Sequence, residues 1–193
     1  MNKRIAAVTA WALMTIAGCS STPTPMAEVS TAITFPPLFS GQHDELSSYG
    51  PTSLTVGGAP IQHPGIIRLR VCNQDKSACR VGVAKFKAQL MLVSLNKTDA
   101  TFLVDLEFDV GQEQTIRGDS SKYTAQMPDD QPTMRDNYKK SGERITLPYN
   151  RVGRIDMPYG VAFKICVEAP ATEQNAKHRG CPGAEVELSR ALQ

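Results

Sequence analysis

Residues 102–110 read Phe-Leu-Val-Asp-Leu-Glu-Phe-Asp-Val. Every second residue of this stretch is apolar, and the positions between them include Asp105, Glu107 and Asp109. A helix would spread the five alternating apolar side chains around its circumference, whereas a strand places them all on one face. The stretch therefore predicts a β-strand with one buried face and one solvated face.

The same period of two recurs elsewhere in the chain. Residues 67–71 alternate Ile, Leu and Val with two arginines, and residues 81–95 fit one extended strand, or two strands with a bulge near Gly82. Residues 151–167 predict a hairpin, and residues 184–188 a terminal strand. Strong helical periodicity appears nowhere after the N-terminal segment. We therefore expect an all-β fold, a single antiparallel β-sandwich or half-open barrel.

The N-terminal segment has the three parts of a secretory signal peptide. Lys3 and Arg4 supply positive charge, residues 5–16 are apolar, and two small residues precede Cys19. A helix that spans a bilayer needs about 20 apolar residues, so this run is too short to remain as an anchor. Residues 1–18 are accordingly predicted to be removed on export.

The sequence Ile16-Ala17-Gly18-Cys19 resembles the lipobox of bacterial lipoproteins. The resemblance implies that Cys19 receives a lipid on its thiol, that cleavage occurs before it, and that its new amino group is acylated. Serines rather than an Asp follow Cys19, which in Gram-negative lipoproteins is similar to the outer-membrane sorting pattern. The alternative is an ordinary secretory signal with a cleavage site that ends in Gly-Cys. We expect an outer-membrane lipoprotein that faces the periplasm.

Residues 20–31 are rich in Ser, Thr and Pro and contain little to bury. Such a composition is typical of a flexible tether. The expected organisation is a signal peptide at 1–18, a lipidated tether at 19–32 and a β-sandwich domain at 33–193. Residues 33–39 are apolar and stiffened by proline. They are expected either to dock on the domain as an edge segment or to form a short linear contact for a partner.

The charge of the chain depends on the signal peptide. The full sequence has a formal net charge of +2, with 21 basic and 19 acidic residues. Residues 1–18 contain two basic residues and no acidic one, so the mature chain is neutral. A neutral chain has no net field to hold it on nucleic acid or on an anionic bilayer. We therefore expect no nucleic-acid partner, and a membrane attachment that depends on the lipid.

Apart from Cys19 the chain has four cysteines, at 72, 79, 166 and 181. An even number in an exported protein predicts disulfides. Cys72 and Cys166 each end a predicted strand, and Cys79 and Cys181 follow the adjoining loops, so we favour Cys72–Cys79 and Cys166–Cys181. The alternative joins Cys72 to Cys166 and Cys79 to Cys181. Neither spacing is that of a structural zinc site, and no metal or other cofactor is expected.

Residues 111–143 differ from the rest of the chain because they are polar and carry only scattered apolar side chains. Loops of this length inside a domain are usually functional or disordered. We expect a long polar loop with a short strand around 122–125 and a short helix around 133–140. It is either a solvated insertion or a partner-binding loop.

Three histidines are present, at His43, His63 and His178. Each is expected in an exposed loop, and His63 precedes a predicted turn at Pro64-Gly65. Catalysis of the triad type needs a histidine beside a nucleophile and an orienting acid, and the sequence contains no Gly-x-Ser-x-Gly elbow. Asp105 and Glu107 fit the polar side of a strand. We therefore expect no catalytic residues and a protein that is not an enzyme.

These observations favour an outer-membrane-anchored, non-catalytic binding or assembly subunit of an envelope complex. Small outer-membrane lipoproteins of secretion, conjugation and pilus machines resemble it in location and in their expected fold. An envelope protein is thus the expected partner. The alternative function is that of a lipid-tethered carrier or inhibitor, which binds a small molecule or a periplasmic enzyme.

Overall fold

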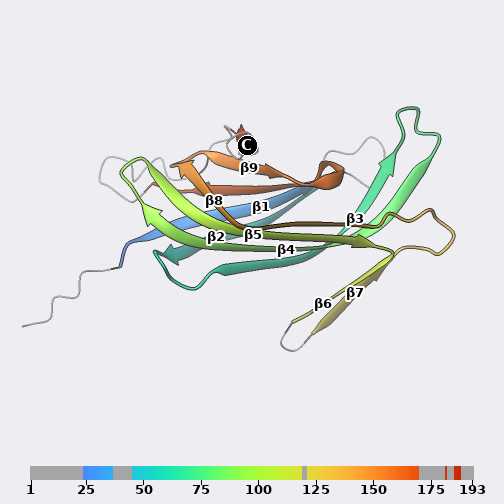
Figure 1. Ribbon diagram of the computed structural model, residues 1–193, viewed down its shortest axis with the longest axis horizontal. Helices are drawn as coiled ribbons and strands as arrows, with labels where there is room; N and C mark the ends of the chain where they lie inside the picture. Colours follow the sequence, from blue (N-terminus) through green and yellow to red (C-terminus); the bar gives the residue numbers. More distant parts are fainter. Residues whose placement is uncertain (1–23, 37–44, 119–120, 170–180, 182–184, 188–193) are drawn as a thin grey trace, which may run out of the picture.

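The computed structural model describes residues 24–36, 45–118, 121–169, 181 and 185–187 (Figure 1). Four predicted features lie outside these residues: the signal peptide, the lipidation site at Cys19, and the loop histidines His43 and His178. Within the described part of the chain, no helix has the length and apolarity needed to cross a membrane.

Two sheets form the body of the molecule (Figure 1). The first contains, in spatial order, β11 (Glu185–Glu187), β9 (Val152–Asp156), β10 (Ala162–Val167), β1 (Met26–Phe35) and β2 (Glu45–Thr55). The second contains β3 (Ile61–Cys72), β4 (Cys79–Leu95), β5 (Asp99–Gly111) and β8 (Asp136–Pro148). A separate hairpin pairs β6 (Glu113–Arg117) with β7 (Lys122–Gln126), and a short 3₁₀ turn, η1 (Pro158–Gly160), links β9 to β10. All pairs are antiparallel except β11 with β9.

The sheets pack face to face and do not close into a barrel, which confirms the prediction of a β-sandwich. The alternating apolar residues of β5 lie between the sheets, and Phe102 and Leu106 are fully buried there. Phe86 of β4 meets Phe163 of β10 across the interface, with ring centroids 5.6 Å apart. Burial of large apolar side chains from both sheets therefore holds the sandwich together.

The predicted tether is too long, because β1 begins at Met26. This strand lies inside the first sheet, where Ile33 pairs with Phe163 on one side and with Ser47 on the other. Its inward residues, which include Val29 and Ile33, are almost completely buried. The expectation of an edge segment at residues 33–39 was therefore wrong for residues 33–35. Small and polar side chains between the apolar ones made a buried strand resemble a solvated linker.

The stretch 111–143 is not a long loop. The predicted strand around residues 122–125 is confirmed as β7, but the helix expected around 133–140 is wrong because residues 136–140 belong to β8. There Tyr138 pairs with Phe108 and Lys139 with Glu107 of the neighbouring strand β5. Pairing to a strong strand that is already formed outweighs a weak local preference for helix.

The predicted hairpin at 151–167 is confirmed as β9 and β10. The long run at 81–95 forms the single strand β4, and its irregularity lies at residues 92–94 rather than near Gly82. A terminal strand is also present, as β11.

Both favoured disulfides are present in the structure. Cys72 is bonded to Cys79 with a Cα–Cα distance of 3.9 Å, and Cys166 to Cys181 with a distance of 6.2 Å. The first joins the facing ends of β3 and β4, which are direct neighbours in the ladder. The alternative pairing between the two hairpins is excluded.

Candidate functional site

The β6–β7 hairpin packs against the outer face of the second sheet near one end of β4. Val81 and Val83 of β4 are buried there beneath Ala125 and Met127, and Ile66 is partly buried against them. This group of five residues is called the hairpin cluster below. The inner face of the same part of β4 contributes Ala84 and Phe86 to the sandwich core. Residues 81–84 of β4 are thus buried on both faces, which explains their continuous run of apolar and small residues.

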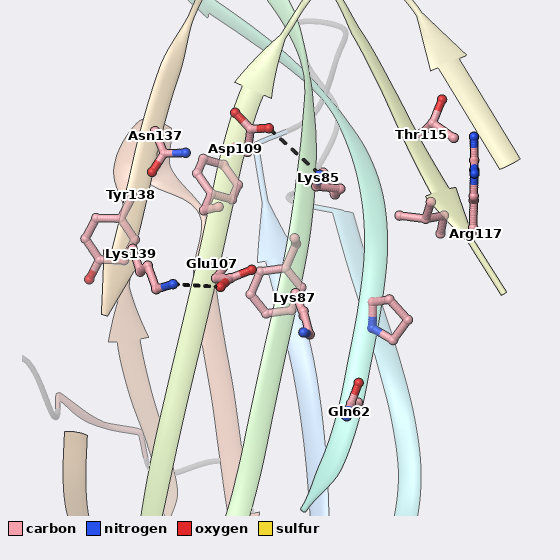
Figure 2. A pocket seen from close by; sticks show the side chains of 14 residues that line it. Gln62, Lys85, Lys87, Glu107, Asp109, Thr115, Arg117, Asn137, Tyr138 and Lys139 are labelled. Atoms are coloured by element: carbon pink, nitrogen blue, oxygen red, sulfur yellow. Dashed lines mark ion pairs between the residues drawn. The ribbon is translucent and has the colours of Figure 1, made fainter. Parts of the chain in front are cut away.

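A first cleft lies between the hairpin and the charged outer face of the sheet (Figure 2). Its volume is about 580 Å³. Lys139 contacts Glu107 at 3.0 Å and Lys85 faces Asp109 at 4.0 Å, so neighbouring strands carry matched charges across this face. Arg117 of β6 lines the hairpin side of the cleft.

Two carboxylates of this face are held in their ionised form. The pKa of Glu107 is lowered by the hydrogen bond and charge of Lys139. The pKa of Asp105 is lowered chiefly because it accepts hydrogen bonds from the backbone N–H of Gly142 and from the hydroxyl of Ser141. A carboxylate that is ionised and engaged in this way is unsuited to act as a general acid at neutral pH. Both residues lie on the polar face of β5, where the sequence placed them.

A second cleft, of about 680 Å³, lies beside the other strand of the hairpin. One wall carries Arg68 and Arg70 of β3 with Val81 of β4. The opposite wall consists of Gln126, Met127, Pro128, Gln131 and Pro132. Among these residues there are two positive charges and no carboxylate, so the cleft combines a basic wall with a largely apolar one. We refer to it as the arginine cleft.

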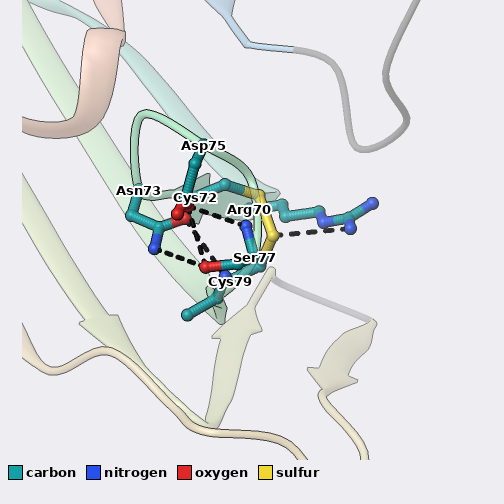
Figure 3. The surroundings of a disulfide bond; sticks show 7 residues. Arg70, Cys72, Asn73, Asp75, Ser77 and Cys79 are labelled. Atoms are coloured by element: carbon teal, nitrogen blue, oxygen red, sulfur yellow. Dashed lines mark hydrogen bonds between the residues drawn. A yellow bond between two sulfur atoms is a disulfide. The ribbon is translucent and has the colours of Figure 1, made fainter.

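The arginine cleft lies next to the disulfide that ends the β3–β4 hairpin (Figure 3). The guanidinium of Arg70 donates a hydrogen bond to Sγ of Cys79 over 3.5 Å. In the adjoining turn Asp75 accepts hydrogen bonds from the backbone N–H and the hydroxyl of Ser77, and these bonds lower the pKa of Asp75. The disulfide and the turn hold together the tip of the β3–β4 hairpin, next to the two cleft residues Arg70 and Cys79.

His63 is not an exposed loop histidine, and Pro64-Gly65 is not a turn. All three lie in β3, where Pro64 pairs with Lys87 and Gly65 with Phe86. His63 points between the sheets, is 7% exposed, and shares a hydrogen bond of 3.0 Å with Thr31 of β1. Burial lowers its pKa below the ordinary value. Pro and Gly indicated a turn locally, but both are tolerated in an edge strand.

Sequence reasoning noted Arg68 and Arg70 only as the polar half of an alternating strand. The signal that singles them out is their spacing, because two like charges two residues apart share one face of a strand. Only the structure brings Met127 and the two prolines to the same place. Among the described residues, no three His, Cys, Asp or Glu side chains lie close enough to hold a metal ion.

The fold and the clefts define a class: an antiparallel β-sandwich with a hairpin that projects from one end and two open clefts beside it. The chain matches no protein-family model, and no curated protein or solved structure is significantly similar to it. Its function must therefore be argued from the geometry of its own residues.

Proposed function

We propose that this chain is a lipoprotein that is anchored in the outer membrane through Cys19 and acts as a non-catalytic binding subunit of an envelope protein complex. One observation carries the proposal: the start of the folded domain lies beside one end of β4, and the arginine cleft lies at the other end of that strand. A protein held at one end presents its binding surface at the other.

The positions of the two ends follow from hydrogen bonds at the start of β1. The backbone N–H of Val56 donates to the carbonyl of Pro25 over 3.0 Å, and the neighbouring Gly57 donates to the carbonyl of Leu92 over 2.9 Å. The chain therefore enters the sandwich beside the last residues of β4. The arginine cleft is lined by Val81, near the other end of that strand. Leu92 follows Val81 by eleven residues, and eleven residues of extended chain span roughly 35 Å. This length separates the chain entry from the arginine cleft.

The character of the clefts favours a protein partner over a small apolar ligand. Sites for small molecules are mostly enclosed and apolar, whereas both clefts here open to solvent and are lined by charged side chains. Arginine and methionine are enriched where two proteins meet, and both residue types line the arginine cleft. This observation supports a binding subunit rather than the carrier.

The anchoring part of the proposal is tested with the variant Cys19→Ser in intact cells. We expect this variant to remain unprocessed or to be soluble, because it lacks the thiol that accepts the lipid. Normal fractionation of the variant with the outer membrane would overturn the assignment of Cys19.

The binding part is tested by placing a photo-crosslinking residue at Gln126, beside the arginine cleft, and separately at Lys97, in the loop after β4 at the anchor end. We expect Gln126 to yield one large crosslinked envelope complex and Lys97 to yield far less of it. Recovery of the monomer alone from both positions would contradict the proposed function.

A further inference from the structure

The strand β3 forms one edge of the second sheet, and its open edge can be assigned residue by residue. Among the described residues it pairs with β4 alone. Cys72 and Cys79 lie directly opposite each other with their Cα atoms 3.9 Å apart, and the next pair is joined by the hydrogen bond from Asn73 N–H to the carbonyl of Ala78. In an antiparallel ladder the closely spaced pairs are those that do not exchange hydrogen bonds. Cys72 therefore directs its backbone groups away from β4.

The same holds for every second residue before Cys72, because the register of β3 with β4 is unbroken. Ile66, Arg68 and Arg70 thus direct their N–H and C=O groups to the open edge. Pro64 belongs to the same set, and it has no N–H to offer. The proline blocks strand addition along the first half of β3. The second half, residues 66–72, remains a template of four N–H donors, those of Ile66, Arg68, Arg70 and Cys72.

The side chains along this half of the edge carry an unusual charge pattern. Arg68 and Arg70 lie across from Val83 and Val81 of β4. Elsewhere on the same sheet face the cross-strand neighbours have opposite charge, as in Lys85 with Asp109. Arg68 is exposed and makes no ion pair with any described residue. The residue of β4 that faces Arg68 is thus an uncharged valine.

The opposite face of the same half-strand is apolar. Ile67 and Leu69 are buried in the sandwich core, and Val71 is partly exposed at its rim. A strand added beside β3 would place alternate side chains next to the arginines on one face and next to these aliphatic residues on the other.

We propose that residues 66–72 of β3 bind an extended segment of a partner protein in which acidic residues alternate with apolar ones. The segment adds a strand to the second sheet, sets its carboxylates beside Arg68 and Arg70 in the arginine cleft, and covers Val71 with its apolar face. This inference rests on the proposed binding function and names the surface and the chemistry of the partner. A second copy of this chain fits poorly, because pairing of two β3 edges in antiparallel orientation brings like charges together.

The test uses the purified full chain in detergent micelles and a short peptide that alternates glutamate with valine. Two control peptides share its length: one replaces every glutamate by lysine, and the other keeps the composition but groups the glutamates. Affinity is measured by fluorescence anisotropy, and the exchange of individual amides by NMR. We expect only the alternating acidic peptide to bind, with a weaker affinity as salt is raised. It should protect the amides of Ile66, Arg68 and Arg70, which exchange rapidly in the free chain.

Three variants at one position separate charge from backbone pairing. Arg68→Glu should weaken binding by at least about tenfold, because it places a like charge beside the peptide carboxylates. Arg68→Gln removes the charge and keeps the edge N–H, whereas Arg68→Pro removes both. The proline is compatible with the fold because the N–H at 68 points outward, as at Pro64. We expect Arg68→Pro to bind at least about fivefold more weakly than Arg68→Gln. Lys97→Glu, at the far end of β4, is the matched control and should bind like the parent.

Three outcomes would overturn the proposal. The grouped and alternating peptides bind equally, Arg68→Gln and Arg68→Pro bind the peptide equally, or the protected amides lie at another edge. Dimerisation of the chain through β3 without peptide would overturn it as well. These outcomes are independent of the crosslinking at Gln126 in cells. A partner can therefore be found there even if the β3 edge fails, and the two failures are distinguishable.

Discussion

The sandwich body and the cleft end of the molecule are held together in different ways. In the body, large side chains from two sheets interdigitate, and residues as distant in sequence as Ile33 and Phe163 pair directly. At the cleft end the β6–β7 hairpin is attached by the small hairpin cluster, and the β3–β4 tip is closed by a disulfide. Regions with few buried contacts open locally at a lower free energy than the core. The comparison indicates a rigid body that carries an adaptable end.

The largest expected effect is in the body. Phe163→Ala removes a fully buried ring that packs on Phe86. We expect it to lower the free energy of unfolding by about 3–5 kcal/mol, the range found for large aromatic truncations in cores. Urea denaturation followed by circular dichroism measures the change. A loss below about 1 kcal/mol would mean that the two sheets do not depend on this contact.

A smaller effect, and a different one, is expected at the cleft end. Val83→Ala and Val104→Ala delete the same atoms from two strands of one sheet, and both valines are buried. Val104 lies in the sandwich core and Val83 in the hairpin cluster. Each substitution is expected to lower the free energy of unfolding the region around it by about 1.5–2 kcal/mol.

Hydrogen exchange shows which region of the molecule each substitution destabilises. Val104→Ala should lower global stability and accelerate exchange in β5 and its neighbours. Val83→Ala should accelerate exchange mainly in β6 and β7, with a smaller shift of the urea midpoint. If the two variants give the same exchange pattern, the hairpin unfolds together with the body and the contrast between the regions is wrong.

The smallest expected effect is a pH dependence in the body. Burial lowers the pKa of His63 in the folded chain, whereas the unfolded chain has the ordinary value of 6.5. Below pH 6.5 the unfolded chain therefore binds a proton more readily. The free energy of unfolding should therefore have its full value above pH 6.5. It should fall as the pH drops from there towards the pKa of His63 in the folded chain.

The measurement compares the parent with His63→Gln. Their difference in unfolding free energy should change with pH only in this window, since other groups titrate alike in both chains. A difference that stays constant between pH 7.5 and pH 5 would show that His63 is accessible to protons in the folded state.

Much of the fold was predictable because its elements depend on near neighbours. The strand β5 follows from its period of two, and the two disulfides from cysteines that flank single hairpins or loops. The strand β1 was missed because its Ser, Thr and Ala residues resemble those of a linker. β1 is placed inside its sheet by pairing with β10, more than 120 residues away. His63 was misplaced for the same kind of reason: the local Pro-Gly signal was followed, whereas its partner Thr31 belongs to another strand.

The sequence by itself determined the strand periods, the even set of cysteines and the expectation of a lipid at Cys19, since each is a property of a short stretch of chain. Only the tertiary structure decided that residues 26–35 fill the interior of a sheet, that β3 keeps an open edge, and that Arg68 and Arg70 face an apolar wall. These outcomes depend on which strands become neighbours. That choice is made by contacts between residues far apart in sequence, which no local pattern records.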